Sequence, residues 1–287
     1  MDYQLGMYEK ALPADLSFHE KLQSTRNSGF DWLELSIDES DEKQERLYWN
    51  RQQLHDLQTA MDDTGVPILT MCLSGHRKYP LGSLNSAIRK KSLDIMERSV
   101  ALAAELGIRV IQLAGYDVYY EESNSQTISY FCKNLELAVL SAARMGVCLG
   151  FETMETPFLD TISKGMKYID MIHSPYLGMY PDIGNLKNSA CMYGSDVVSD
   201  LKKGYGRIFA AHLKETKPGV YRNMRFGTGH TEYVPCISEL FMQGVRMFTG
   251  EFWYLGEEDW QDNVRNSGVF LRDKIEQAYG IYAKSVQ

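Results

Sequence analysis

Short apolar runs recur along the chain, and five of them follow a glycine that comes after a helix-like segment. These runs begin near residues 30, 66, 108, 147 and 245, after Gly29, Gly65, Gly107, Gly146 and Gly244. Glycine commonly ends a helix, so the pattern predicts a helix followed by a strand, repeated along the chain. Between the runs lie helical stretches, and in one the apolar positions from Ile128 to Met145 fall on a single face.

Three further apolar runs, at residues 5–8, 177–183 and 208–215, bring the number of strand-then-helix units to eight. Alternating units of this kind imply a parallel sheet, and eight of them in 287 residues predict a closed (β/α)8 TIM barrel. An open doubly wound sheet is the weaker alternative, because neither GxGxxG after the first strand nor GxxxxGK[ST] occurs. Since no linker or low-complexity segment interrupts the pattern, we expect residues 1–287 to form one domain.

The charge balance is acidic, with a net charge of -8 and a pI near 5.3. This gives no basic surface for a nucleic acid backbone. No apolar run approaches the roughly 20 residues that span a bilayer, and the start of the chain does not read as a signal peptide. We therefore expect a cytoplasmic protein that binds neither nucleic acid nor membrane. The five cysteines are scattered and odd in number, which favours free thiols.

Acids and one histidine stand at the ends of four successive predicted strands. Glu152 ends VCLGFE, Asp182 follows in YPDIG, His212 lies in AAHLK and Glu251 lies in TGEFW. The carboxyl ends of barrel strands meet at one mouth, so these four side chains should converge.

A carboxylate at the end of a buried strand is costly unless it is paired or bound to a metal. A single acid there is more often a helix cap or a loop partner than a ligand. Four such residues on successive strands instead predict a site for one divalent metal ion. Three carboxylates and one imidazole suit Mn²⁺ or Zn²⁺, and Co²⁺ or Mg²⁺ would also be accepted.

Longer stretches give a more specific indication than the metal set: LGMYEKALP, MCLSGHRKYPLGS, IRVIQLAGYDVYY, YPDIGNL and HLKETKPGVYRN. With these stretches the chain resembles, nearly end to end, the L-xylulose-5-phosphate and L-ribulose-5-phosphate 3-epimerase family of the xylose-isomerase-like TIM barrels. The resemblance implies an isomerase that acts on a small sugar phosphate. It also implies a pentose phosphate step of carbohydrate metabolism, in L-ascorbate catabolism, and a homodimer.

The resemblance further implies roles for the four strand-end residues. Glu152, Asp182, His212 and Glu251 would bind one divalent metal, and the two glutamates would also be the catalytic acid and base. One glutamate would remove the C3 proton of a ketopentose 5-phosphate, and the other would return a proton to the opposite face of a cis-enediolate.

Two departures from related epimerases of free ketohexoses bear on the substrate. Those relatives carry a histidine three residues after the metal aspartate and an arginine six residues after the metal histidine. Here these positions are Asn185 and Pro218, which favours a phosphorylated substrate. Glu155 occupies the neighbourhood of an acid that binds a substrate hydroxyl in the relatives.

A phosphate group requires cations or backbone donors, and two loops at the barrel mouth are basic: GHRKYPLGS and KETKPGVYRNMRFG. Basic loop residues are often only solvated, but these loops provide candidates. The predicted substrate-binding residues are Tyr8, His76, Arg77, Gln112, Glu155, Lys214 and Lys217.

Three alternatives stay open at the level of sequence. An aldose–ketose isomerase on the same barrel could pass through the same enediolate. A sensor of sugar phosphates could keep the barrel without turnover, although both acid–base residues are present. An endonuclease at abasic DNA sites would use several zinc ions and many histidines, whereas this chain has six histidines and an acidic surface.

Overall fold

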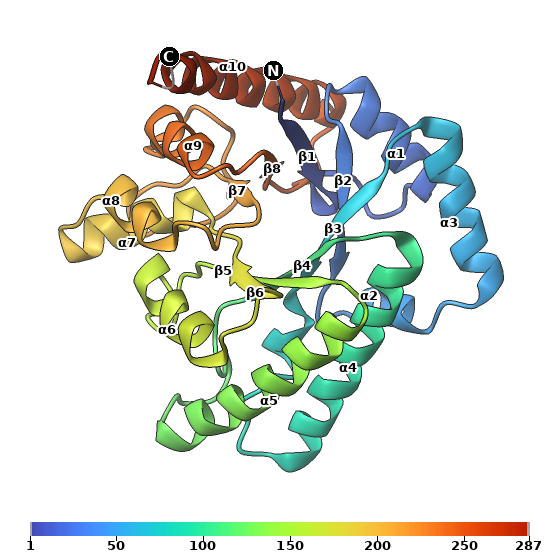
Figure 1. The fold of residues 1–287 in the computed structure, drawn as a ribbon. Helices are drawn as coiled ribbons and strands as arrows, with labels where there is room; N and C mark the ends of the chain where they lie inside the picture. Colours follow the sequence, from blue (N-terminus) through green and yellow to red (C-terminus); the bar gives the residue numbers. More distant parts are fainter. Residues whose placement is uncertain (1, 286–287) are drawn as a thin grey trace.

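The strands of the computed structural model, which describes residues 2–285, form a single parallel sheet that curls into a barrel (Figure 1). The sheet order is β6-β5-β4-β3-β2-β1-β8-β7. Two isolated bridges connect the segments of its edge strands β6 and β7: Met179 of β6 pairs with Ile208 ahead of β7, and Asp182 beyond β6 pairs with His212 of β7. The predicted (β/α)8 TIM barrel is confirmed. The strands are β1 Gln4–Tyr8, β2 Trp32–Ile37, β3 Ile68–Leu73, β4 Val110–Ala114, β5 Cys148–Glu152, β6 Leu177–Met179, β7 Ala211–Leu213 and β8 Met247–Gly250.

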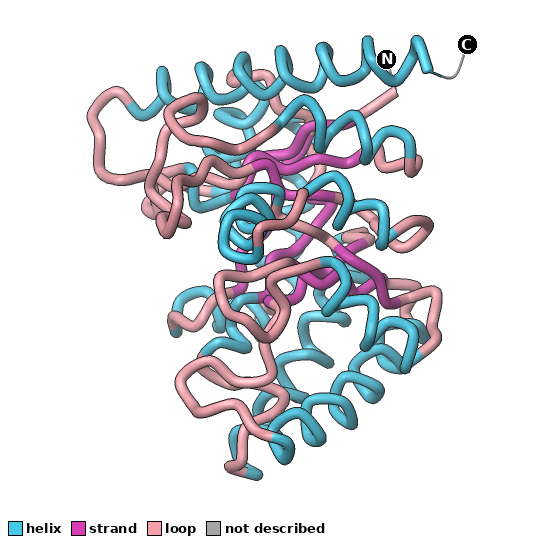
Figure 2. The backbone as a smooth tube through the Cα atoms, turned by 90° about the vertical axis from the view of Figure 1, so that its left-hand side faces the viewer, coloured by secondary structure: helices cyan, strands magenta, loops and turns pink. Residues whose placement is uncertain are grey.

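Helices form the outer layer around these strands, and Figure 2 shows long loops gathered at one end of the sheet. The helices are α1 Phe18–Asn27, α2 Asp41–Glu45, α3 Arg51–Thr64, α4 Ser86–Leu106, α5 Ser125–Arg144, α6 Ile162–Ile172, α7 Ile183–Tyr193, α8 Val197–Leu201, α9 Tyr233–Met242 and α10 Trp260–Ser285. Four 3₁₀ turns add η1 Glu9–Ala11, η2 Arg46–Tyr48, η3 Ser74–Arg77 and η4 Lys202–Gly204.

The helix α5 illustrates how the sequence places an element against the sheet. The side chain of Asn124 caps its start by accepting hydrogen bonds from the first turn. Phe131, Leu135 and Val139 then recur on one face and are buried in the core. Met145, which the apolar pattern placed on the same face, lies beyond the last helical residue and is 53% exposed.

Alternation along β2 sends side chains to both faces of the barrel wall. Leu33, Leu35 and Ile37 belong to the hydrophobic core beneath the helices. Glu34 and Ser36 alternate with them, so their side chains enter the barrel interior. Both are fully buried. The interior is therefore partly polar near the mouth.

Two other expectations can be compared with the structure. Within residues 2–285, no helix combines the length and apolar character needed to cross a membrane. The five cysteines are free thiols, as their spacing predicted.

Candidate metal and active site

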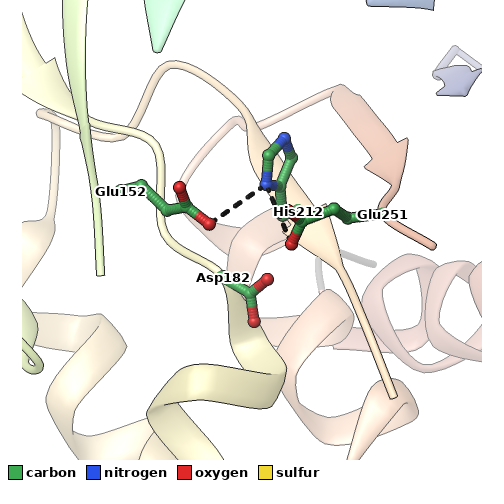
Figure 3. Close-up of side chains that lie close together, drawn as sticks. All are labelled: Glu152, Asp182, His212 and Glu251. Atoms are coloured by element: carbon green, nitrogen blue, oxygen red, sulfur yellow. Dashed lines mark ion pairs between the residues drawn. The ribbon is translucent and has the colours of Figure 1, made fainter. Parts of the chain in front are cut away.

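The four residues at the predicted strand ends converge at the barrel mouth. Their ligand atoms all lie within 4.8 Å of one another, and Figure 3 shows the side chains pointing toward a common centre. Glu152 is the last residue of β5, His212 lies in the middle of β7, and Glu251 directly follows β8. Asp182 lies three residues beyond β6 as the N-cap of α7, where it accepts a 2.7 Å hydrogen bond from the backbone of Asn185.

His212 is oriented by a glutamate on the far side of its ring. Its Nε2 lies 2.7 Å from Oε1 of Glu34, and both side chains are fully buried. The carboxylate keeps a proton on Nε2 and turns Nδ1 toward the acids. Burial opposes the charge of the ring, but Glu34 and Glu251 outweigh it and hold the pKa of His212 well above its usual range. Nδ1 lies 3.5 Å from an oxygen of Glu152 and 3.5 Å from one of Glu251.

Hydroxyl groups in turn hold Glu34. Thr70 donates to its Oε2 at 2.5 Å, and Tyr180 donates to the same oxygen at 3.0 Å. The Tyr180 hydroxyl also lies 2.6 Å from Oγ1 of Thr249. The orientation of the imidazole thus depends on a buried polar network that crosses the barrel.

Lys214 is the only lysine or arginine that forms an ion pair with these four residues in the described part of the chain. Its ammonium lies 2.9 Å from Oδ2 of Asp182 and 3.0 Å from Oε2 of Glu251. Neither of these oxygens has a hydrogen-bond partner, although both are buried, and Nδ1 of His212 is also buried without one. The three carboxylates outnumber the one ammonium, and three atoms that could bind a metal have no hydrogen-bond partner. The site therefore fits a divalent cation.

The acids respond differently to this environment. Burial, together with repulsion from Glu251, raises the pKa of Glu152. Burial and the neighbouring carboxylates also raise the pKa of Asp182, to about 8, against the opposing effect of Lys214. Burial opposes ionisation of Glu251 as well, but Lys214 and His212 outweigh it and hold its pKa well below the usual range. The two glutamates thus favour opposite protonation states.

A small pocket opens above the cluster. Glu152 and Glu251 line it, together with four of the predicted substrate-binding residues: Tyr8, Arg77, Glu155 and Lys214. Gln112 lies below them, fully buried, and its amide donates a short hydrogen bond to Glu152. The structure thus brings together both predicted glutamates and most of the predicted contacts.

Two predicted substrate contacts lie elsewhere. His76 is 5% exposed, and its Nε2 lies 3.1 Å from the backbone oxygen of Ser92, because the ring packs inside the loop. Burial lowers its pKa to about 4, which leaves the ring uncharged at neutral pH. Lys217 is exposed at the turn that it forms with Val220. Neither residue lines the pocket.

Several residues of this region were missed at the sequence level. Trp253 and Lys10 line the pocket, as does Arg222 of the predicted basic loop KETKPGVYRNMRFG. Glu34 has the same signal as Glu152, an acid inside an apolar run, but it stands in the middle of WLELSI rather than at its end. Strand alternation would have placed it inside the barrel.

Comparisons with known proteins agree with this architecture. Residues 22–274 match the family model described as "Xylose isomerase-like TIM barrel". The chain is 41% identical over 275 residues to the L-ribulose-5-phosphate 3-epimerase UlaE of Escherichia coli O139:H28, covering 96% of this chain and 95% of the relative. It is 44% identical over 256 residues to the protein of the same name from Shigella boydii serotype 18, covering 89% of each chain.

Solved structures share the fold at low identity. A structure of L-ribulose 3-epimerase matches with a TM-score of 0.81 and 18% identity over 99% of this chain and 98% of that one. A crystal structure of D-psicose 3-epimerase matches with a TM-score of 0.77 and 14% identity, over 95% of this chain and 99% of that one. From the family model and the identity to its relatives, the chain belongs to the xylose isomerase-like TIM barrel family, in the branch of isomerases named L-ribulose-5-phosphate 3-epimerase.

Proposed function

We propose that the chain interconverts L-ribulose 5-phosphate and L-xylulose 5-phosphate by removing and returning a proton at C3. The relatives that cover nearly the whole chain carry this activity in their names. The observation that carries the proposal for this chain is the placement of Glu152 and Glu251. Their carboxylates lie at equal distances of 3.5 Å from Nδ1 of His212 and both border the pocket.

Inversion at C3 requires a base on one face of the substrate and an acid on the other. Glu152 and Glu251 come from β5 and β8, which lie on opposite sides of β6 and β7 around the barrel. A ketose seated above His212 would therefore have one carboxylate on each side. Because the pKa of Glu152 is raised and that of Glu251 is lowered, Glu152 favours the protonated form and Glu251 the ionised form before substrate binds.

Glu152, Asp182, His212 and Glu251 would hold one divalent cation, with Mn²⁺ or Zn²⁺ preferred and Co²⁺ or Mg²⁺ acceptable. When bound, such an ion would polarise the C2 carbonyl and stabilise the negative charge of the enediolate. Glu34 would fix the orientation of the His212 ring through its hydrogen bond with Nε2, the ring nitrogen that faces away from the metal. Gln112 would hold one oxygen of Glu152, leaving the other free to move a proton.

The pocket cations differ in their freedom to bind a phosphate. Lys10 pairs with Asp38, Arg222 pairs with Glu155 at 3.2 Å, and Lys214 lies among the acids. Among residues 2–285, no carboxylate lies within ion-pair distance of Arg77, and its buried Nε has no hydrogen-bond partner. The Arg77 guanidinium stacks over Tyr119, 4.8 Å from the ring centre. We assign the phosphate to Arg77, and a substrate hydroxyl to Glu155 or Tyr8.

The test is an exchange experiment with L-xylulose 5-phosphate in D₂O, using the protein loaded with Mn²⁺ and a chelated sample. We expect deuterium at C3 together with L-ribulose 5-phosphate in the loaded sample and neither in the chelated one, as followed by NMR.

Two other results would overturn the assignment. An aldopentose phosphate without inversion at C3 would indicate an aldose–ketose isomerase. Binding of the sugar phosphate without exchange, with each of the four metals in turn, would indicate a sensor.

A further inference from the structure

Glu215 is a buried carboxylate that the proposed reaction does not use. It follows Lys214 directly, beyond the end of β7. The Lys214 ammonium contacts Asp182 and Glu251, whereas the Glu215 carboxylate contacts the loop that follows. Glu215 is 3% exposed. Among the described residues, no lysine or arginine lies within ion-pair distance of it, so its charge must be stabilised by other donors.

Those donors are backbone N–H groups of one loop. Oε2 accepts from Gly227 at 2.7 Å, and Oε1 accepts from Thr231 at 3.1 Å and from Thr216 at 3.2 Å. Hydrogen bonds from N–H groups to an ionised carboxylate are among the stronger ones in proteins. One side chain thus joins both ends of the segment 216–231, which we call the β7–α9 loop.

The base of this loop packs directly on the carboxylate. His230 donates its backbone N–H to the Thr216 oxygen at 2.9 Å, and Thr231 donates its hydroxyl to the Lys214 oxygen at 2.9 Å. A Cβ atom at Gly229 would lie 2.1 Å from the Thr216 oxygen and 2.5 Å from Oε1 of Glu215. Only glycine fits there, because both close atoms belong to the same hydrogen-bonded base.

The far end of the loop forms part of the pocket. Tyr221 and Arg222 both line it, and Arg222 pairs at 3.2 Å with Glu155, another lining residue. The turn before them is held by Asn188, which accepts from Gly219 at 3.3 Å and donates to the Val220 oxygen at 3.2 Å. The loop is therefore anchored at its base by Glu215 and at its turn by Asn188.

We propose that Glu215 is a positioning residue, whose carboxylate holds the β7–α9 loop in place as a wall of the substrate pocket. The effect on substrate rests on the proposed epimerase function, whereas the effect on the loop does not. Without the carboxylate, three backbone N–H groups lose their acceptor and bind water instead, so the loop opens more often. Tyr221 and Arg222 then leave the pocket for part of the time.

The test uses Glu215→Ala and the near-isosteric Glu215→Gln, with Glu232→Ala as the matched control. Glu232 is a neighbouring carboxylate, 47% exposed, that pairs with Lys187 and holds no loop backbone. Limited trypsin digestion reports loop opening through cleavage after Arg222 and Arg225. We expect cleavage in Glu215→Ala to accelerate by about tenfold to a hundredfold, with a smaller increase in Glu215→Gln.

Kinetics and metal binding complete the test. KM for L-xylulose 5-phosphate should rise about tenfold while kcat falls less. The affinity for Mn²⁺ should stay unchanged, because the Glu215 carboxylate touches none of the four residues that would hold the metal. If Glu215→Ala is cleaved at the same rate as Glu232→Ala and has the same KM, the proposal is overturned. Absence of turnover in the unmodified protein would count against the proposed function alone, since digestion still measures the loop. If Glu215→Ala does not fold, Glu215→Gln decides in the same way.

Discussion

Two buried clusters of charge lie at the same end of the barrel and differ in nearly every other respect. The acid cluster consists of Glu152, Asp182, His212 and Glu251, with Lys214 as its cation. The Glu9 cluster is the reverse, one carboxylate among three cations. Oε1 of Glu9 contacts Lys21 at 3.1 Å and Lys43 at 2.7 Å, and both of its oxygens accept from Arg46, at 2.6 and 2.7 Å.

The difference lies in how completely the polar atoms are satisfied. Glu9 also accepts from the backbone of Ser36 at 3.0 Å, and none of the cluster's side-chain atoms in the described structure is buried without a partner. In the acid cluster, one atom each of Asp182, His212 and Glu251 is buried without a hydrogen bond. Removing one partner of a fully paired buried charge destabilises a fold strongly, whereas buried charge left unsatisfied indicates a ligand.

The largest expected effect comes from Glu152→Gln. The amide keeps the shape of the side chain but cannot accept or return the C3 proton, so kcat should fall by about 10²- to 10⁴-fold. Stability should not fall, because the change removes one of several mutually repelling buried acids. The rate of C3 exchange and the free energy of unfolding of chelated protein would be measured together.

Glu136→Gln provides the control, because Glu136 is an exposed glutamate of α5. An unchanged exchange rate in Glu152→Gln would remove Glu152 from the mechanism. If the exchange rate fell and the free energy of unfolding also fell by several kcal/mol, Glu152 would instead support the fold as Glu9 does.

Glu9→Gln should have the opposite profile. Removing the carboxylate leaves three buried cations without their shared partner, which should cost about 3–5 kcal/mol of unfolding free energy at pH 7. Exchange at C3 by the protein that remains folded should change little, because Glu9 does not line the pocket. Urea unfolding with parallel activity measurements checks both parts.

The stability lost in Glu9→Gln should also depend on pH. Burial opposes ionisation of Glu9, but Arg46, Lys43 and Lys21 outweigh it and hold its pKa well below the usual range. Its contribution is thus fully present above the unfolded pKa of about 4.3 and is lost as the pH falls below it. The difference between unmodified protein and variant should be largest at neutral pH and shrink below about pH 4. A constant difference, or one matched by the exposed Glu45→Gln, would contradict this account.

The acid cluster could be predicted from the sequence, whereas the Glu9 cluster could not. The barrel follows from repeated helix, glycine and strand signals, and the acid cluster follows from strand ends, which always meet at the barrel mouth. Glu9 and its three cations come from three separate segments, and no pattern along the chain predicts their meeting. His76 and Arg77 are adjacent in sequence, yet only Arg77 reaches the pocket, because the packing of a loop decides which side chain is buried. Roles in catalysis and metal binding stay predictions.

The smallest of the three effects tests whether the acid cluster depends on the residues behind it. Glu34→Gln retains an oxygen that can accept from Nε2 of His212, but it removes the charge that makes the imidazole a better ligand. The affinity for Mn²⁺, measured calorimetrically on chelated protein, should fall about 10- to 100-fold. Activity should largely return at saturating Mn²⁺, because Glu34 does not touch the pocket, and the exposed Glu42→Gln should behave as the unmodified protein. If the affinity is unchanged while stability falls, Glu34 belongs with Glu9 among the residues that only hold the barrel together, and the polar network around it has no part in metal binding.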